Sequence, residues 1–182
     1  MKRIVIMVAM AVLLLSVAAQ AQAPLPKPGP EHKKLEIWLG DWTFVEEGPA
    51  TPFGPAYKIS GKSSVKPILG GLFIEFRVEA KGTAGPVQYF EVDSYNPATK
   101  KYTWNGFASD GSIHTVAYTI EGTSVPYSGT EVINGKQAKI RGTITFTPDF
   151  MSCEEKREIS ADGKTWMPFF ANKFTKVKSS PQ

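Results

Sequence analysis

His114 is the residue whose type and position most suggest chemistry. It alternates with Val116, Tyr118 and Ile120, so all four side chains lie on one face if this stretch is a strand. An imidazole on an apolar face must find a hydrogen-bond partner or have its pKa lowered. Neutral imidazole is also a common ligand of metal ions and of haem iron. Either a hydrogen bond to a neighbouring tyrosine or carbonyl group, or contact with a bound molecule, would satisfy His114.

Aromatic side chains with a period of two could complete a binding site around this histidine. Trp104 and Tyr102 share one face of the preceding strand pattern. A barrel of about eight or more strands can hold one small ligand in its interior. We therefore predict that Trp104, His114 and Tyr118 contact a small hydrophobic or aromatic molecule. The alternative is that the aromatic residues only pack a core.

The sequence contains no motif for catalysis or metal binding. Gly-x-Ser-x-Gly, His-Glu-x-x-His and phosphate-loop patterns do not occur. With two histidines and one cysteine, we expect no structural zinc site, a solvated His32 and a buried, inert Cys153. The acidic residues are expected mostly on charged strand faces or in turns, and the adjacent Glu154 and Glu155 point to opposite faces. We predict no catalytic residue, no metal and no cofactor; haem bound through His114 is the alternative.

The elements that would position these residues are strands. About ten strand patterns follow one another, separated by short turns rich in Gly, Pro, Asn and Asp. The clearest covers residues 72–79, where apolar residues beginning with Leu72 and Ile74 alternate with mostly charged ones. Turns this short join only antiparallel neighbours, and closing the sheet removes its exposed edges. The pattern predicts an all-β protein, an antiparallel up-and-down β-barrel with its apolar faces turned inward.

A short N-terminal helix should cap one end of this barrel. Residues 31–39 carry an apolar stripe at helical spacing, led by Leu35 and Trp38, and Pro30 suits a first helical turn. A helix this short gains its stability by packing against something else. Gly40 then lets the chain turn sharply into the first strand.

The first residues have the pattern of a secretory signal peptide. Lys2 and Arg3 precede a short apolar run, and Ala-x-Ala patterns follow. We therefore expect cleavage after residue 21 and a periplasmic or secreted protein. The predicted organisation is a signal peptide over 1–21, a proline-rich tether over 22–30, a single β-barrel domain over 31–178 and a disordered tail over 179–182.

The net charge argues against a nucleic-acid partner. The formal net charge is +4, and two of the positive residues lie in the expected signal peptide. The remaining charge of about +2 is scattered along the chain, which is too weak to attract nucleic acid. We predict no nucleic-acid partner and no membrane span once the signal peptide is removed. The oligomeric state is not indicated.

Five segments of the expected mature chain resemble a known family. They are residues 28–35 (PGPEHKKL), 39–42 (LGDW), 68–71 (ILGG), 95–97 (YNP) and 160–166 (SADGKTW). Together they resemble a bacterial family known as domain of unknown function 1579. The resemblance implies a calycin-like barrel, similar in architecture to lipocalins, fatty-acid-binding proteins and the haem-binding nitrobindins. It implies no established activity.

The segment from Gly40 to Trp42 is also similar to the Gly-x-Trp that opens lipocalin barrels. In lipocalins an arginine late in the barrel packs on that tryptophan. Here the last strand pattern offers Lys173 and Lys176 instead, and the nearest arginine is Arg157. The chain departs from the lipocalin pattern at this point.

These observations lead to one function and two alternatives. We predict a non-catalytic protein of the bacterial envelope that binds a small hydrophobic or aromatic molecule in its barrel. The first alternative is a haem-binding or small enzymatic barrel that uses His114. The second is a packed envelope interaction domain with no ligand. Whether the barrel is hollow separates these possibilities.

Overall fold

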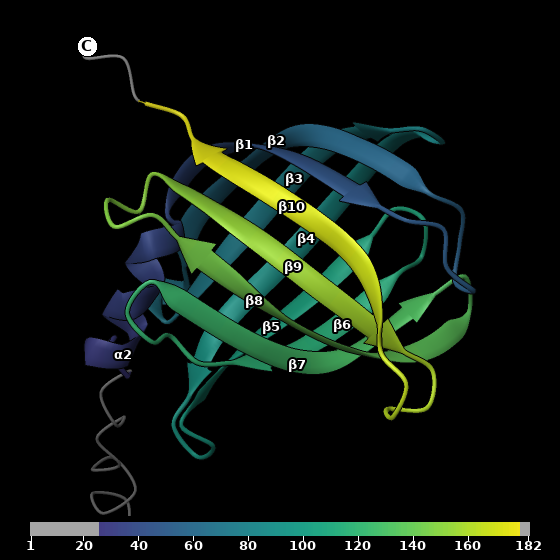
Figure 1. The fold of residues 1–182 in the computed structure, drawn as a ribbon. Coiled ribbons are helices and arrows are strands. Elements are labelled where there is room, and N and C mark those ends of the chain that lie inside the picture. Colours follow the sequence, from purple (N-terminus) through teal and green to yellow (C-terminus); the bar gives the residue numbers. More distant parts are fainter. Residues whose placement is uncertain (1–25, 179–182) are drawn as a thin grey trace, which may run out of the picture.

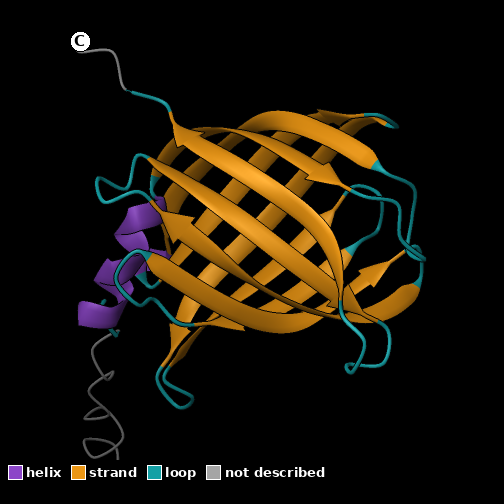
Figure 2. Cartoon of the chain, viewed as in Figure 1, coloured by secondary structure: helices purple, strands orange, loops and turns teal. Residues whose placement is uncertain are grey.

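Ten strands follow one another between residues 26 and 178, the part of the chain that the computed structural model describes (Figure 1). They are β1 (Gly40–Gly48), β2 (Tyr57–Ile68), β3 (Phe73–Gly82), β4 (Gly85–Asn96), β5 (Lys101–Ala108), β6 (Ile113–Tyr118), β7 (Ser124–Ile133), β8 (Lys136–Phe146), β9 (Ser152–Ser160) and β10 (Met167–Lys176). Each strand pairs antiparallel with the next, and β1 also pairs with β10, so the sheet closes on itself (Figure 2). The predicted all-β, up-and-down barrel is confirmed.

Some of the predicted segments lie outside the described residues. These are the signal peptide over 1–21, residues 22–25 of the tether and the tail over 179–182. Within residues 26–178, no helix is long and apolar enough to cross a membrane.

The apolar faces of the strands turn inward, because side chains alternate across a closed sheet. The apolar residues that alternate along β3 and β8 face the interior: Ile74, Phe76, Val78, Ala138, Ile140, Ile144 and Phe146. Leu72 is the exception, since it precedes the strand. Gly70 and Gly71, both with positive φ, form the tight turn η2 (Leu69–Gly71), and strand pairing begins only at Phe73.

A short helical segment closes one end of the barrel (Figure 1). It consists of α2 (Pro30–Lys33) followed directly by η1 (Lys34–Trp38). The predicted helix over 31–39 is therefore present, but its second half is a 3₁₀ helix. It also begins one residue earlier than predicted, because proline suits the first turn of a helix. Leu35 and Trp38 are buried against the barrel, which gives the short segment its stability.

Trp42 fastens this segment to the first and last strands. Its indole Nε1 donates a hydrogen bond of 2.7 Å to the carbonyl oxygen of Trp38. Lys176 Nζ lies 4.7 Å from the centre of the Trp42 ring and donates to the carbonyl oxygen of Ile37 at 3.3 Å. Lys176 therefore packs on the tryptophan where lipocalins use a late arginine.

His32 is less exposed than predicted. It is half-buried, its Nδ1 accepts a hydrogen bond of 3.2 Å from the backbone N–H of Gly29, and its ring packs edge-on against Tyr95. The expectation of a solvated side chain is wrong because the helical segment packs His32 against Tyr95 at the end of β4.

The connection between β1 and β2 lies over the opposite end of the barrel (Figure 1). We call residues 49–56 the Phe53 loop. Phe53 is 7% exposed, and its carbonyl oxygen accepts a hydrogen bond of 2.9 Å from Asn134 in the β7–β8 turn. Thr51 and Gly54 hydrogen-bond each other through their backbones, which keeps the loop compact.

Candidate ligand-binding site in the barrel interior

A cavity of about 330 Å³ lies inside the barrel and extends to the Phe53 loop. Its lining is rich in aromatic residues: Trp38, Trp42, Phe44, Phe76, Tyr89, Trp104 and Phe170. The three residues predicted to contact a ligand, Trp104, His114 and Tyr118, all line this cavity. Their role as ligand contacts stays a prediction. The interior is hollow, so the alternative of a packed interaction domain loses its main support.

Charged side chains from the strands also face this cavity. Five carboxyl groups and one guanidinium group take part: Glu46, Glu91, Asp93, Glu131, Glu155 and Arg157. The expectation that acidic residues lie on outer faces or in turns is wrong for these five. Alternation along a strand shows which residues share a face, but it does not show which face a barrel turns inward when polar and apolar residues are mixed.

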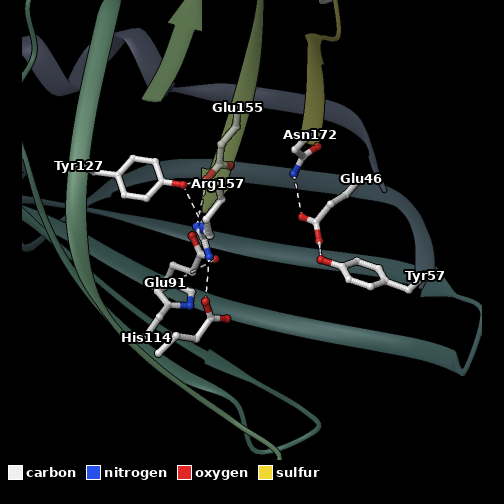
Figure 3. Close-up of polar contacts among 9 residues, drawn as sticks. Glu46, Tyr57, Glu91, His114, Tyr127, Glu155, Arg157 and Asn172 are labelled. Atoms are coloured by element: carbon white, nitrogen blue, oxygen red, sulfur yellow. Dashed lines mark hydrogen bonds and ion pairs between the residues drawn. The ribbon is translucent and has the colours of Figure 1, made fainter. Parts of the chain in front are cut away.

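Arg157 on β9 is the centre of a first polar group (Figure 3). Its guanidinium donates to Tyr127 Oη at 2.8 Å, to Glu131 Oε2 at 3.1 Å and to Glu155 Oε1 at 3.0 Å. Its Cζ lies 4.4 Å from the centre of the Phe170 ring. Each of its three nitrogens therefore has a protein partner, and the buried positive charge is balanced by two carboxyl groups.

Gly142 of β8 gives this group the room that it needs. It lies in register between Tyr127 on β7 and Arg157 on β9. A methyl group on Gly142 would overlap the ring and hydroxyl of Tyr127. Tyr127 and Arg157 can contact each other across β8 only because Gly142, the residue between them, has no side chain.

His114 and Glu91 meet in the same way over Gly106 of β5. Nε2 of His114 lies 3.7 Å from Oε1 of Glu91. Burial, and then the charge of Arg157, lowers the pKa of His114 to about 3. Burial, and then the neighbouring Asp93, raises the pKa of Glu91 to about 8. At pH 7 the imidazole is neutral and the carboxyl group is mostly protonated, so this contact is not a salt bridge.

Two other carboxyl groups are held by neutral partners. Glu46 accepts hydrogen bonds from Tyr57 Oη at 2.8 Å and from Asn172 Nδ2 at 3.0 Å (Figure 3). Asp93 accepts one from Tyr118 Oη at 2.6 Å. Burial raises the pKa of Glu46 to about 7 and that of Asp93 to about 7. Both groups therefore change charge close to neutral pH.

Several buried polar atoms of the cavity lining have no hydrogen-bond partner among the described residues. They are Trp38 Nε1, Asp93 Oδ1, Trp104 Nε1, His114 Nε2 and Asn172 Oδ1. A buried polar atom left without a partner costs about 1–3 kcal/mol. These atoms mark the positions at which a molecule in the cavity would be recognised.

Haem does not fit this site well. An iron atom bound to His114 Nε2 would lie about 2 Å from that nitrogen, as metal–imidazole bonds require. The Glu91 carboxyl group lies 3.7 Å from the same nitrogen, and the Trp104 ring packs against the imidazole at 5.2 Å between ring centres. The residues around His114 therefore do not support haem ligation.

Replacing Gly106 by alanine should destabilise the barrel by about 1–3 kcal/mol, the usual cost of overpacking. The added methyl group would overlap the His114 imidazole and push it away from Glu91. Urea unfolding measures the free energy of unfolding. Gly54→Ala is a matched control, because nothing lies within 4 Å of the methyl group it adds. In a His114→Ala background, Gly106→Ala should cost less than half as much; equal costs in both backgrounds would contradict the proposed overlap.

The sequence carries a signal for part of this polar interior. On β4, Glu91 and Asp93 share a face with Tyr89 and Tyr95, and acidic residues on an aromatic strand face can be read as cavity-facing. The neighbours that decide the chemistry come from other strands. Arg157 on β9 reaches Glu131 on β7 across β8, and the register of these three strands, which no local pattern reveals, sets this contact.

Comparison with known proteins identifies a family and a fold. A family model described as "Protein of unknown function (DUF1579)" matches residues 27–176. The crystal structure of Rv2717c from M. tuberculosis is similar, with a TM-score of 0.59 and 12% sequence identity, over 82% of this chain and 99% of that chain. The S-type phycobiliprotein lyase CPES from Guillardia theta has a TM-score of 0.55 and 11% identity, over 82% of this chain and 94% of its own. At these identities the likeness shows the fold alone. No curated protein matches the chain.

Proposed function

The chain belongs to DUF1579, a family of proteins of unknown function, and we propose that it binds a small, largely apolar or aromatic molecule inside its barrel without transforming it. One observation carries this proposal. The barrel encloses a cavity of about 330 Å³ whose lining is aromatic and includes buried polar atoms without partners. Pockets of this size with a few convergent polar groups are typical of small-molecule sites.

The enzymatic alternative is less well supported. It relied on His114 as an acid or base. A histidine whose pKa is lowered to about 3 is poorly matched to proton transfer near neutral pH, where a pKa close to the working pH is the most effective. The similar barrel from Guillardia theta is named a phycobiliprotein lyase, so this fold can carry a small-molecule function, but the residues of each chain decide its chemistry.

Tryptophan fluorescence gives a direct test, because the four tryptophans divide between two environments. Trp38, Trp42 and Trp104 line the cavity, whereas Trp166 lies under Arg141, whose Cζ is 4.2 Å from the centre of the indole ring. We expect N-phenyl-1-naphthylamine, a neutral apolar fluorophore, to quench the emission saturably as it enters the cavity.

Two variants separate binding inside the barrel from binding elsewhere. Trp104→Phe should reduce the quenching amplitude, and Trp166→Phe should leave the quenched part of the signal unchanged. Quenching that never saturates, or that disappears with Trp166 rather than with Trp104, would overturn the proposed function.

A further inference from the structure

We propose that the ligand is an organic cation, such as a protonated amine on an aromatic or apolar body, and that its positive charge lies between Glu91 and Asp93 on β4. This inference rests on the proposed binding function and adds the chemical class of the molecule.

The balance of charged groups inside the barrel is the first reason. Five carboxyl groups from the strands line the cavity together with one guanidinium group. That guanidinium, on Arg157, is used by Glu131 and Glu155. Within the described residues, Glu91 and Asp93 have no lysine or arginine within salt-bridge distance. A buried carboxylate without a cation is costly, so a ligand that supplies the cation removes that cost.

Unpartnered acceptor atoms at the same place are the second reason. Asp93 is 3% exposed and uses Oδ2 to accept the Tyr118 hydroxyl, which leaves Oδ1 without a partner. Glu91 lies two residues away on the same inward face of β4. Beside it, the unpartnered Nε2 of His114 can accept a hydrogen bond when the ring proton is on Nδ1. Acceptor atoms of Asp93, Glu91 and His114 therefore line one part of the cavity, where an ammonium group could donate hydrogen bonds.

The aromatic wall beside these acceptors is the third reason. Trp104 on β5 is in register with Asp93, and Phe76 on β3 is in register with Glu91; both rings line the cavity. Aromatic faces attract cations, more strongly when water is excluded. The same wall would also pack the apolar body of the ligand.

Binding of a cation should be coupled to proton release. Burial raises the pKa of Glu91 to about 8 and that of Asp93 to about 7, so part of this pair is protonated at pH 7. A bound positive charge favours the ionised form and expels a proton. The other titratable or charged groups that line the cavity with this pair are Glu46, Tyr57, Tyr89, His114, Tyr118, Tyr127, Glu131, Cys153, Glu155, Arg157 and, at the β5–β6 turn, Asp110. His114 stays neutral through this pH range because its pKa is far lower.

A matched series of naphthalenes tests the charge of the ligand. The probes are 1-naphthylmethylamine, 1-naphthylmethanol and 1-naphthylacetic acid, which share one apolar body and differ in charge. Calorimetry at pH 7 in two buffers of different ionisation enthalpy gives both affinity and proton release. We expect the amine to bind at least tenfold more tightly than the alcohol, with release of a fraction of a proton up to about one per ligand. Affinity for the amine should rise between pH 6 and pH 8, since an alkyl ammonium stays charged there, as lysine does.

Variants locate the charge. Glu91→Gln and Asp93→Asn should each reduce the preference for the amine over the alcohol by at least fivefold. Glu154→Gln on the outer face of β9, where Glu154 is exposed and pairs with Lys173, is the matched control and should leave the preference unchanged.

The outcomes distinguish the two proposals. Equal binding of the three probes, or tighter binding of the acid, would overturn the cation inference and leave the binding function intact. A preference for the amine that survives Glu91→Gln and Asp93→Asn would place the charge elsewhere and also overturn it. Failure of all three probes to bind would overturn the proposed function itself.

Discussion

Replacing Arg157 by methionine should lower the free energy of unfolding by about 3–5 kcal/mol at pH 8, the usual cost of removing one partner of a buried ion pair. Arg157 is only 5% exposed. Its guanidinium donates hydrogen bonds to Tyr127, Glu131 and Glu155. Methionine would fill most of the space, but it would leave two buried carboxylates without a positive charge. Urea unfolding followed by far-ultraviolet circular dichroism measures the change.

Arg141→Met provides a control with the same substitution on the neighbouring strand. Arg141 pairs with Glu158 on the outer face of the barrel, where the two side chains are 49% and 43% exposed. Exposed pairs contribute about 0–1 kcal/mol, so this variant should change stability little. Adding Glu155→Gln and Glu131→Gln to Arg157→Met should restore part of the lost stability. If the two arginine variants cost the same, the interior network does not stabilise the barrel as described.

Stability should fall as the pH rises from about 4.5 to about 8, which is the reverse of the usual behaviour of carboxyl groups. The pKa values of Glu46, Glu91 and Asp93 are raised by burial to about 7, 8 and 7. Between the unfolded and folded pKa values the folded chain binds more protons than the unfolded chain, so raising the pH favours unfolding. Above the folded pKa values the loss is complete. Thermal unfolding at a series of pH values should show this decline.

Glu91→Gln should flatten the decline and stabilise the protein at pH 9 by roughly 2–4 kcal/mol. Glutamine resembles the protonated carboxyl group and removes the charge that must be buried at high pH. Glu154→Gln is the matched control on the outer face. His114 acts in the opposite direction only at lower pH: its folded pKa of about 3 means that stability falls as the pH drops below the unfolded value of about 6.5. A Glu91→Gln curve parallel to the wild-type curve would show that Glu91 does not titrate as described.

The fold could be predicted from the sequence because its signals are local. Alternation along residues 72–79 and the short turns between strands already require antiparallel neighbours. The aromatic part of the cavity followed from the same period, and Trp104, His114 and Tyr118 do line one cavity. The type of helix depends less on local sequence. The second half of the predicted helix over 31–39 is a 3₁₀ helix, and it packs on the barrel through buried side chains.

The polar part of the site could not be predicted in the same way. Glu131, His114, Gly106 and Glu91 form one row across β7, β6, β5 and β4. Their spacing in the sequence contains no sign of this row, because it is set by the register of three strand pairs. In the sequence, Gly106 has no feature that distinguishes it from other strand glycines. In the structure, it lies between the imidazole of His114 and the carboxyl group of Glu91.

The pairing of β1 with β10 has a consequence for how the barrel assembles. It joins residues as far apart in the chain as Trp42 and Lys176, so the last seam forms only when both ends of the domain have come together. Contacts of such long sequence separation make folding slow, in the range of milliseconds to seconds. Until that seam forms, every intermediate exposes two unpaired strand edges, which are templates for aggregation. The barrel is therefore most prone to aggregation during synthesis and refolding, before β1 and β10 have paired.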